Sequence, residues 1–155
     1  MNKHSLSKIL ARASYEEVAE FALAICNEHN PVIVKEPVKT LTMIKMREPV
    51  QQSLFYLGEV MVYEAVVEID GAKGIAVLMC SGASDDADKA LNMAIIDAAI
   101  NRGIFADYGR LTVLGQQQDE LVMKENALHL KTMVSFESMD QKAPEDLGAY
   151  KESVK

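Results

Sequence analysis

The sequence predicts one α+β domain, a mainly antiparallel β-sheet with helices packed on one face. Apolar residues recur at helical spacing before and after a central region of strand-like segments. The last two of these segments flank a glycine-containing turn, which is typical of an antiparallel hairpin. The chain has 155 residues with no internal repeat or linker, which suits a single domain with its own core.

The first long helix is predicted to begin at a capping box. Ser14 can accept a hydrogen bond from an early backbone N–H, and Glu17 can reach back to the start of the helix. An apolar stripe follows at helical spacing: Val18, Phe21, Ala22 and Ile25. Pro31 ends the helix, because proline disfavours helical geometry in the residue before it. A short helical segment, Leu6–Ala13, is expected ahead of it.

Four strands are predicted next. Val32–Val34 is short and stops before Pro37, and Leu41–Met46 is rich in residues that suit a pleated surface. The third strand ends in a stretch that alternates apolar and acidic residues, which indicates one buried side. That side is predicted to comprise Met61, Tyr63, Ala65, Val67 and Ile69. After the turn, Ile75–Cys80 returns as the fourth strand.

A second helix is predicted to be capped by Ser84 and ended by Gly103. Its inner face is mostly alanine, so it can lie close to the sheet: Ala87, Ala90, Leu91, Ala94, Ile95, Ala98 and Ala99. Beyond it, Leu111–Leu114 is predicted as a strand, Gln116–Lys131 as a third helix and Val134–Phe136 as a brief strand. The domain is expected to span residues 1–139, with residues 140–155 as a polar, flexible tail.

The first half of the third strand, Phe55-Tyr56-Leu57-Gly58-Glu59, differs from the second half because it is apolar on both faces. A strand of this kind needs cover on two sides. Glu59 lies on an apolar side next to Gly58, where a carboxylate needs a partner, so we expect a basic group from another subunit to meet it. This segment is therefore predicted to be a protein interface.

Charge and hydropathy restrict the class of protein. A formal net charge of −7 argues against nucleic acid as the main ligand, because phosphate backbones are bound by an excess of Lys and Arg. No apolar run approaches the roughly 20 residues that a membrane-spanning helix needs. The protein is expected to be cytoplasmic.

The residues that most often carry chemistry are scattered. His4, His29 and His129 do not stand at metal-ligand spacing from one another or from a cysteine, and are predicted to be surface residues. Cys26 and Cys80 follow apolar segments and are predicted to be small buried hydrophobes. Neither thiol has a basic neighbour in the sequence that would make it a nucleophile. We therefore expect no catalytic, cofactor-binding or metal-binding residue in this chain.

One alternative remains open. The loop Ser81–Ser84 joins a strand to a helix start, where backbone N–H groups can bind an anion. The chain would then be a stand-alone homodimeric module that binds a phosphorylated metabolite. Asp85 and Asp86 follow the loop directly and no lysine lies within it, which disfavours a phosphate.

Several segments together resemble the PhnG subunit of the carbon–phosphorus lyase core complex, which acts in phosphonate metabolism. These are Phe55–Glu59 with the strand and turn that follow it, Gly74–Cys80, Ala94–Ala99 and Thr132–Met139, together with Arg12–Ile25 and Met43–Arg47. Together they span most of residues 8–139. The sequence departs from many relatives at Ser81–Asp85, where a Gly-Arg-Asp-like segment is replaced, so it resembles a divergent member.

This resemblance implies an assembly of PhnG with PhnH, PhnI and PhnJ. With PhnL, members of this group transfer the ribose triphosphate part of ATP to a phosphonate and displace adenine. A later radical step on PhnJ uses S-adenosylmethionine and an iron–sulfur cluster. ATP and these cofactors are thus expected on partner subunits. The expected partner interface comprises Phe55, Tyr56, Leu57, Gly58, Glu59, Val134, Phe136 and Met139.

Overall fold

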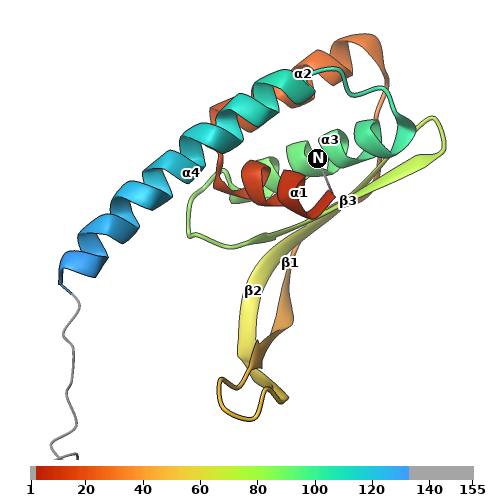
Figure 1. Cartoon of the computed structure of the whole chain (residues 1–155). Helices are drawn as coiled ribbons and strands as arrows, with labels where there is room; N and C mark the ends of the chain where they lie inside the picture. Colours follow the sequence, from red (N-terminus) through yellow and green to blue (C-terminus); the bar gives the residue numbers. More distant parts are fainter. Residues whose placement is uncertain (1–2, 133–155) are drawn as a thin grey trace, which may run out of the picture. The chain divides into compact units, whose positions relative to one another are not determined.

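The computed structural model describes residues 3–132, which form four helices and a three-stranded sheet (Figure 1). The elements are α1 (Lys3–Arg12), α2 (Tyr15–Glu28), β1 (Val32–Arg47), β2 (Leu54–Ile69), β3 (Ala72–Met79), α3 (Asp86–Arg102) and α4 (Tyr108–Lys131). The chain separates into two units, residues 1–120 and 121–155. The predicted α+β class with an antiparallel sheet is confirmed, whereas the predicted boundary at residue 140 lies outside the described residues.

The three strands are antiparallel, in the order β1-β2-β3. β1 and β2 pair along their whole length of 16 residues each, from Val32 opposite Glu68 to Arg47 opposite Leu54. β3 has only 8 residues and ends with Met79 opposite Val62. The distal half of β2 therefore pairs with β1 alone, and the two strands extend beyond β3 as a two-stranded ribbon (Figure 1). We call residues 41–61, with both strands and their connecting turn, the arm.

β1 is one continuous strand, so the predicted break at Pro37 is wrong. The register against β2 shifts between Ile33 and Lys35 and again between Lys35 and Val38, and Pro37 lies within the second irregularity. A proline is tolerated there because β1 is an edge strand and the missing N–H is not needed by the sheet.

The central packing contact is that of α3 on the inner face of β2 and β3 (Figure 1). Ala90, Ala94, Ala98 and Ala99 of α3 are fully buried, as the alanine-rich face predicted. The sheet contributes Ala65, Val67 and Ile69 from β2, with Ala76 and Leu78 from β3. Gly74 allows the closest approach, since an added Cβ would lie 2.2 Å from both the carbonyl O of Ala94 and the backbone N of Ala98.

α1 and α2 are in contact with α3. The capping box of α2 is confirmed, with Ser14 N–H donating to Glu17 Oε2 at 2.8 Å and Glu17 N–H to Ser14 Oγ at 3.2 Å. α2 packs against α3 and buries the predicted stripe from Val18 to Ile25. Lys89 of α3 donates to the carbonyl O of Ala13 at 2.6 Å, which places a cation at the negative end of α1.

Two predicted features of the C-terminal part are wrong. Leu111–Leu114 lies in α4 and not in a strand. Leu111 and Gly115 are buried four residues apart, so the helical period governs this segment although its residues also suit strands. The N-cap of α3 is Asp85, and not Ser84. Gly103 ends α3 as predicted, in the left-handed conformation with φ of 81°.

Replacing Gly74 with alanine should lower the free energy of unfolding by at least about 2 kcal/mol, because its Cβ would meet the backbone of α3. Urea denaturation followed by circular dichroism measures this loss. Gly58→Ala in β2 is the matched control, since nothing lies within 4 Å of its added Cβ. The control should change the free energy by less than about 0.5 kcal/mol. Equal losses in both variants would contradict the close approach of α3.

Candidate functional site

The arm exposes apolar side chains on both of its faces. In β2, Tyr56 is 56% exposed and Leu57 57% exposed, and in β1 Leu41 is 59% exposed. Further exposed apolar residues of the arm are Met43, Ile44, Met46, Leu54, Phe55 and Met61. A two-stranded hairpin is marginally stable in water by itself, so this surface is suited to being covered.

The structure brings together one group of the predicted interface residues. Phe55, Tyr56, Leu57, Gly58 and Glu59 are consecutive, exposed positions of β2 within the arm. The other group, Val134, Phe136 and Met139, lies outside the described residues, as does the predicted strand at Val134–Phe136.

The turn at the end of the arm is held by a network of hydrogen bonds. Glu48 N–H donates to the carbonyl O of Ser53 at 2.9 Å, and the Glu48 carboxylate accepts from the backbone N–H of Val50 at 2.9 Å and from that of Gln51. Arg47 Nη1 donates to the carbonyl O of Gln52 at 2.8 Å. The turn thereby presents Val50, which is 86% exposed, in a defined conformation.

The Glu59 carboxylate has no hydrogen bond or ion pair with any residue between 3 and 132. The two cations of the arm have other partners, since Lys45 Nζ lies 5.1 Å from the ring centroid of Tyr56 and Arg47 donates to the carbonyl O of Gln52. In the isolated chain Glu59 is exposed to water. Covering the arm would remove that water, and a buried carboxylate then needs a counter-charge or hydrogen-bond donors.

The outer face of the sheet extends this apolar surface. α3 covers one face, and on the other Ile75, Val77 and Met79 of β3 are each more than half exposed (Figure 1). Sequence analysis did not identify this face. The apolar run Ile75–Met79 of β3 could have revealed it, because strands that are covered on both faces lack alternating polar residues.

Met61 was predicted to be buried with the alternating residues of β2, and this is wrong. It is 49% exposed, while Ala65, Val67 and Ile69 on the same strand are fully buried. The buried positions lie where β3 and α3 are present. Its neighbour Val62, opposite the last residue of β3, is buried at 4%, whereas Met61 comes one residue beyond this pair and lies in the arm.

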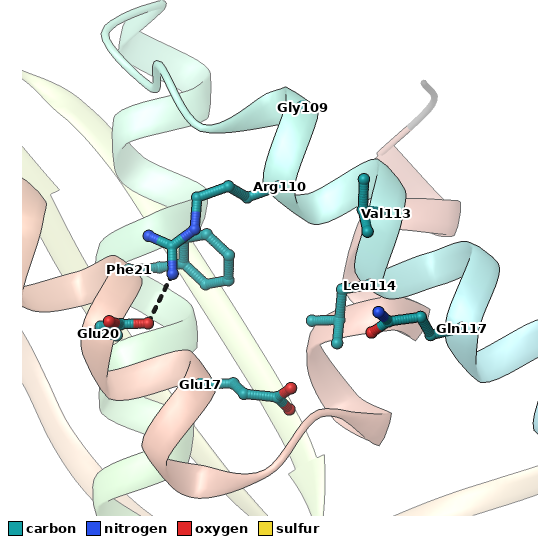
Figure 2. A pocket seen from close by; sticks show the side chains of 8 residues that line it. All are labelled: Glu17, Glu20, Phe21, Gly109, Arg110, Val113, Leu114 and Gln117. Atoms are coloured by element: carbon teal, nitrogen blue, oxygen red, sulfur yellow. Dashed lines mark hydrogen bonds and ion pairs between the residues drawn. The ribbon is translucent and has the colours of Figure 1, made fainter.

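On the helical side, α2 and the first turns of α4 enclose a cleft of about 480 Å³ (Figure 2). Arg110 spans it, with Nη2 at 2.6 Å from Glu20 Oε2 and its guanidinium 4.9 Å from the ring centroid of Phe21. Glu17 at the rim already accepts the capping hydrogen bond from Ser14. The charged groups of the cleft thus have partners within the chain.

The loop Ser81–Ser84, the alternative anion site, is filled by a side chain of the protein. Asp86 is 5% exposed, and its Oδ2 accepts from the backbone N–H of Ser81 at 2.7 Å and of Gly82 at 3.1 Å. Its Oδ1 accepts from Ser81 Oγ at 2.8 Å, and Ala83 N–H donates to Ser81 Oγ. Three successive N–H groups are therefore occupied, which disfavours phosphate binding at this loop.

Burial raises the pKa of the Asp86 carboxyl, but the hydrogen bonds from Ser81 and Gly82, together with the charge of Lys89, outweigh it. The net result is a lowered pKa. Asp86 thus remains ionised in the folded protein and takes the place that an anionic ligand would have at the loop.

The cysteines and histidines form no site among residues 3–132. No group of three or more His, Cys, Asp or Glu residues in this range could hold a metal ion. Cys26 was predicted to be buried, but it is exposed because it lies one position beyond the buried stripe that ends at Ile25. Partial burial of its thiol raises the pKa, which disfavours the nucleophilic thiolate. Cys80 is half-buried.

These features define an α+β protein whose most distinctive surface is an exposed apolar arm. The family model of phosphonate metabolism protein PhnG matches residues 1–141, so the chain belongs to the PhnG family and to phosphonate metabolism. This confirms the family inferred from the sequence. No curated protein matches the chain. Within residues 3–132, none of the helices has the length and hydropathy needed to cross a membrane.

Replacing Asp86 with asparagine should lower the free energy of unfolding at pH 7 by about 1–3 kcal/mol, because the loop donors lose their carboxylate. The folded-state pKa is lowered from 3.8, so the ionised carboxylate stabilises the fold above about pH 4. This contribution is lost as the pH falls through the folded-state pKa.

The difference between wild type and Asp86→Asn should therefore be full at pH 7 and shrink below about pH 4. Urea denaturation at several pH values measures it. Asp88→Asn is the control, since Asp88 also lies in the first turn of α3 but is exposed. A difference that stays constant down to pH 2.5 would exclude the ionised carboxylate as the cause.

Proposed function

We propose that this chain is a non-catalytic subunit of the carbon–phosphorus lyase core complex, and that its function is assembly. The complex transfers the ribose triphosphate part of ATP to a phosphonate, as an α-D-ribose 1-methylphosphonate 5-triphosphate synthase. Its other members are PhnH-, PhnI- and PhnJ-like subunits, with a PhnL-like protein. Family membership supports the link to phosphonate metabolism, and the exposed arm supports assembly with other subunits.

The arm is the observation that carries this proposal. Among residues 3–132, no strand besides β1 pairs with Leu54–Val60, and this stretch exposes aromatic and aliphatic side chains on both faces. Soluble monomers rarely expose contiguous apolar patches larger than a few hundred Å². Subunits of permanent complexes do, because their interfaces typically bury more than about 2,000 Å² and resemble a domain core divided in two.

The polar groups near the helices support an assembly role by having structural partners already. Asp86 holds the loop before α3, Arg110 pairs with Glu20, and Lys89 holds the end of α1. None of these three is left to act on a substrate. In the proposed complex, ATP, S-adenosylmethionine and the iron–sulfur cluster bind to partner subunits, and this chain positions those subunits.

Replacing Phe55 with aspartate should weaken binding of the chain to a PhnI-like partner by roughly 30-fold or more, because a buried aromatic anchor typically contributes at least about 2 kcal/mol. Co-expression with PhnH-, PhnI- and PhnJ-like subunits, followed by affinity co-purification, measures this loss. The isolated variant should keep the circular dichroism spectrum of the wild type, since Phe55 lies outside the core.

Leu23→Asp on α2 is the matched control, because Leu23 is also an exposed apolar residue, at 62%. It should leave the complex intact. An undiminished complex with Phe55→Asp, or a wild-type chain that is monodisperse by itself and never co-purifies with such subunits, would refute the proposed function.

A further inference from the structure

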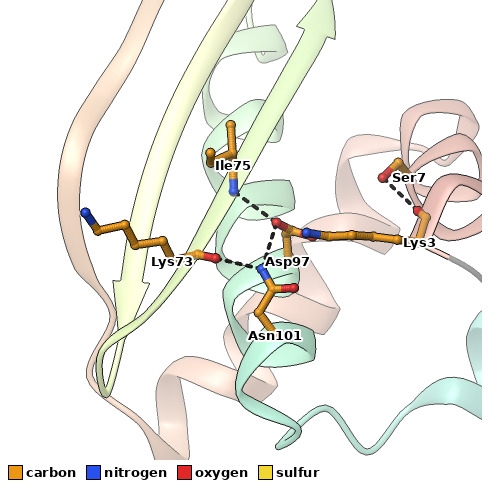
Figure 3. Close-up of polar contacts among 6 residues, drawn as sticks. All are labelled: Lys3, Ser7, Lys73, Ile75, Asp97 and Asn101. Carbon is orange, nitrogen blue, oxygen red and sulfur yellow. Dashed lines mark hydrogen bonds and ion pairs between the residues drawn. The ribbon is translucent and has the colours of Figure 1, made fainter.

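The edges of the sheet differ in how they are protected. An edge strand presents unpaired N–H and C=O groups that can pair with another chain, and proteins usually block such edges. On β3, the block comes from α3 (Figure 3). Asp97 Oδ2 accepts from Ile75 N–H at 3.0 Å, and Asn101 Nδ2 donates to the carbonyl O of Lys73 at 2.6 Å. Lys3 pairs with Asp97 at 3.1 Å and helps to hold it.

The outer edge of β1 is protected by the composition and geometry of the strand. It carries Lys35, Lys39, Lys45 and Arg47, and it contains Pro37. Its pairing with β2 has three irregularities in register. Charged residues, proline and bulges are the usual means of preventing an edge strand from pairing further.

The remaining edge, that of β2 along the arm, has few of these protections. β3 ends at Met79, and the last backbone bond on this side runs from Cys80 N–H to the carbonyl O of Met61 at 3.0 Å. From Leu54 to Val60, β2 contains no proline and no basic residue, and Glu59 is its single charge. One irregularity occurs in this stretch, where Leu57 has no partner on β1.

The bond to Met61 also shows which backbone groups face this open edge. In an antiparallel sheet, the N–H and C=O of successive residues point to opposite edges. The register is regular from Met61 to Gly58. Because the Met61 carbonyl points toward β3, the N–H and C=O of Glu59, two residues away, point the same way, where β3 is absent.

We propose that the β2 edge of the arm binds an extended strand of a partner subunit, which continues the sheet where β3 stops. Backbone hydrogen bonds to Glu59 pair the strand with β2, and a basic side chain of the strand meets the Glu59 carboxylate. Strand addition of this kind obtains affinity from main-chain hydrogen bonds and specificity from side chains. The inference rests on the proposed function, because it specifies how the arm meets its partner.

The charge of the segment favours an unlike partner over a second copy of the chain. Antiparallel pairing of two β2 edges would bring only residues 54–60 of each copy together, and these contain no Lys or Arg. Glu59 would then face either an apolar residue or the second Glu59, and like charges directly opposite destabilise a sheet. A strand from another protein can supply the missing cation.

The test uses two prolines placed on opposite edges of the arm. Met43 and Glu59 are directly opposite each other in the register. They form a non-hydrogen-bonded pair, so the Met43 N–H faces the protected β1 edge and the Glu59 N–H the open one. Glu59→Pro removes the open-edge donor, whereas Met43→Pro perturbs the arm at the same level and leaves that donor in place.

In co-purification with PhnH-, PhnI- and PhnJ-like subunits, Glu59→Pro should weaken binding on the order of tenfold or more relative to Met43→Pro. Glu59→Gln, which keeps the N–H and removes the charge, should bind with intermediate strength. Equal effects of the two prolines would overturn strand addition while leaving the proposed function in place. A wild-type chain that fails to co-purify would instead refute the proposed function itself.

A second measurement does not depend on substitutions. Amide hydrogen exchange at single-residue resolution should show Glu59 slowed by at least about tenfold in the complex relative to the isolated chain, with Met43 unchanged. Unchanged exchange at Glu59 would overturn the proposal. If the Glu59 amide already exchanged as slowly in the isolated chain as in the complex, the proposal would also be overturned, since a segment of the same chain or a second copy would then occupy the edge.

Discussion

The contact between Gly74 and the backbone of α3 is the constraint on which the rest of the fold depends. It allows an alanine-lined helix to lie directly on β2 and β3, so the core is thin and closely packed. Because β3 ends opposite Val62, the two longer strands continue beyond it as the arm, whose apolar side chains are exposed among the described residues. The arm is therefore a consequence of how short β3 is and of where α3 lies.

The polar groups near the core form hydrogen bonds that hold the fold together. Asp86 holds the loop before α3, and Asp97 and Asn101 bind Ile75 N–H and the carbonyl O of Lys73 on the outer edge of β3. These carboxylates, which could be mistaken for a catalytic acid or for metal ligands, therefore have structural roles. Among the described residues, exposed apolar side chains gather on the arm and on the outer face of the sheet, and others lie along α4. For a protein of phosphonate metabolism, this distribution favours a role in binding other proteins over a role in binding substrate.

The outer edges of β1 and β3 are protected, whereas the edge of β2 along the arm is open, so a partner strand can pair with the arm on one side. A hairpin that is apolar on both faces and open at one edge would bind many different proteins if its turn were also disordered. Here the Glu48 carboxylate orders the turn, and a single charge, at Glu59, lies along the open edge of β2. An ordered edge with one charge can discriminate between partners, because a wrong partner leaves that charge unpaired.

The sequence by itself determined the capping box at Ser14, the alanine face of α3, the final hairpin and the apolar segment at Phe55–Glu59. Each of these features depends on the types of neighbouring residues and on their spacing, both of which can be read directly from the sequence. Only the tertiary structure decided that β1 runs through Pro37, that Leu111 belongs to a helix, that Asp86 fills the anion loop and that Met61 is exposed. These outcomes depend on where distant elements begin and end in space, and local periodicity carries no information about that.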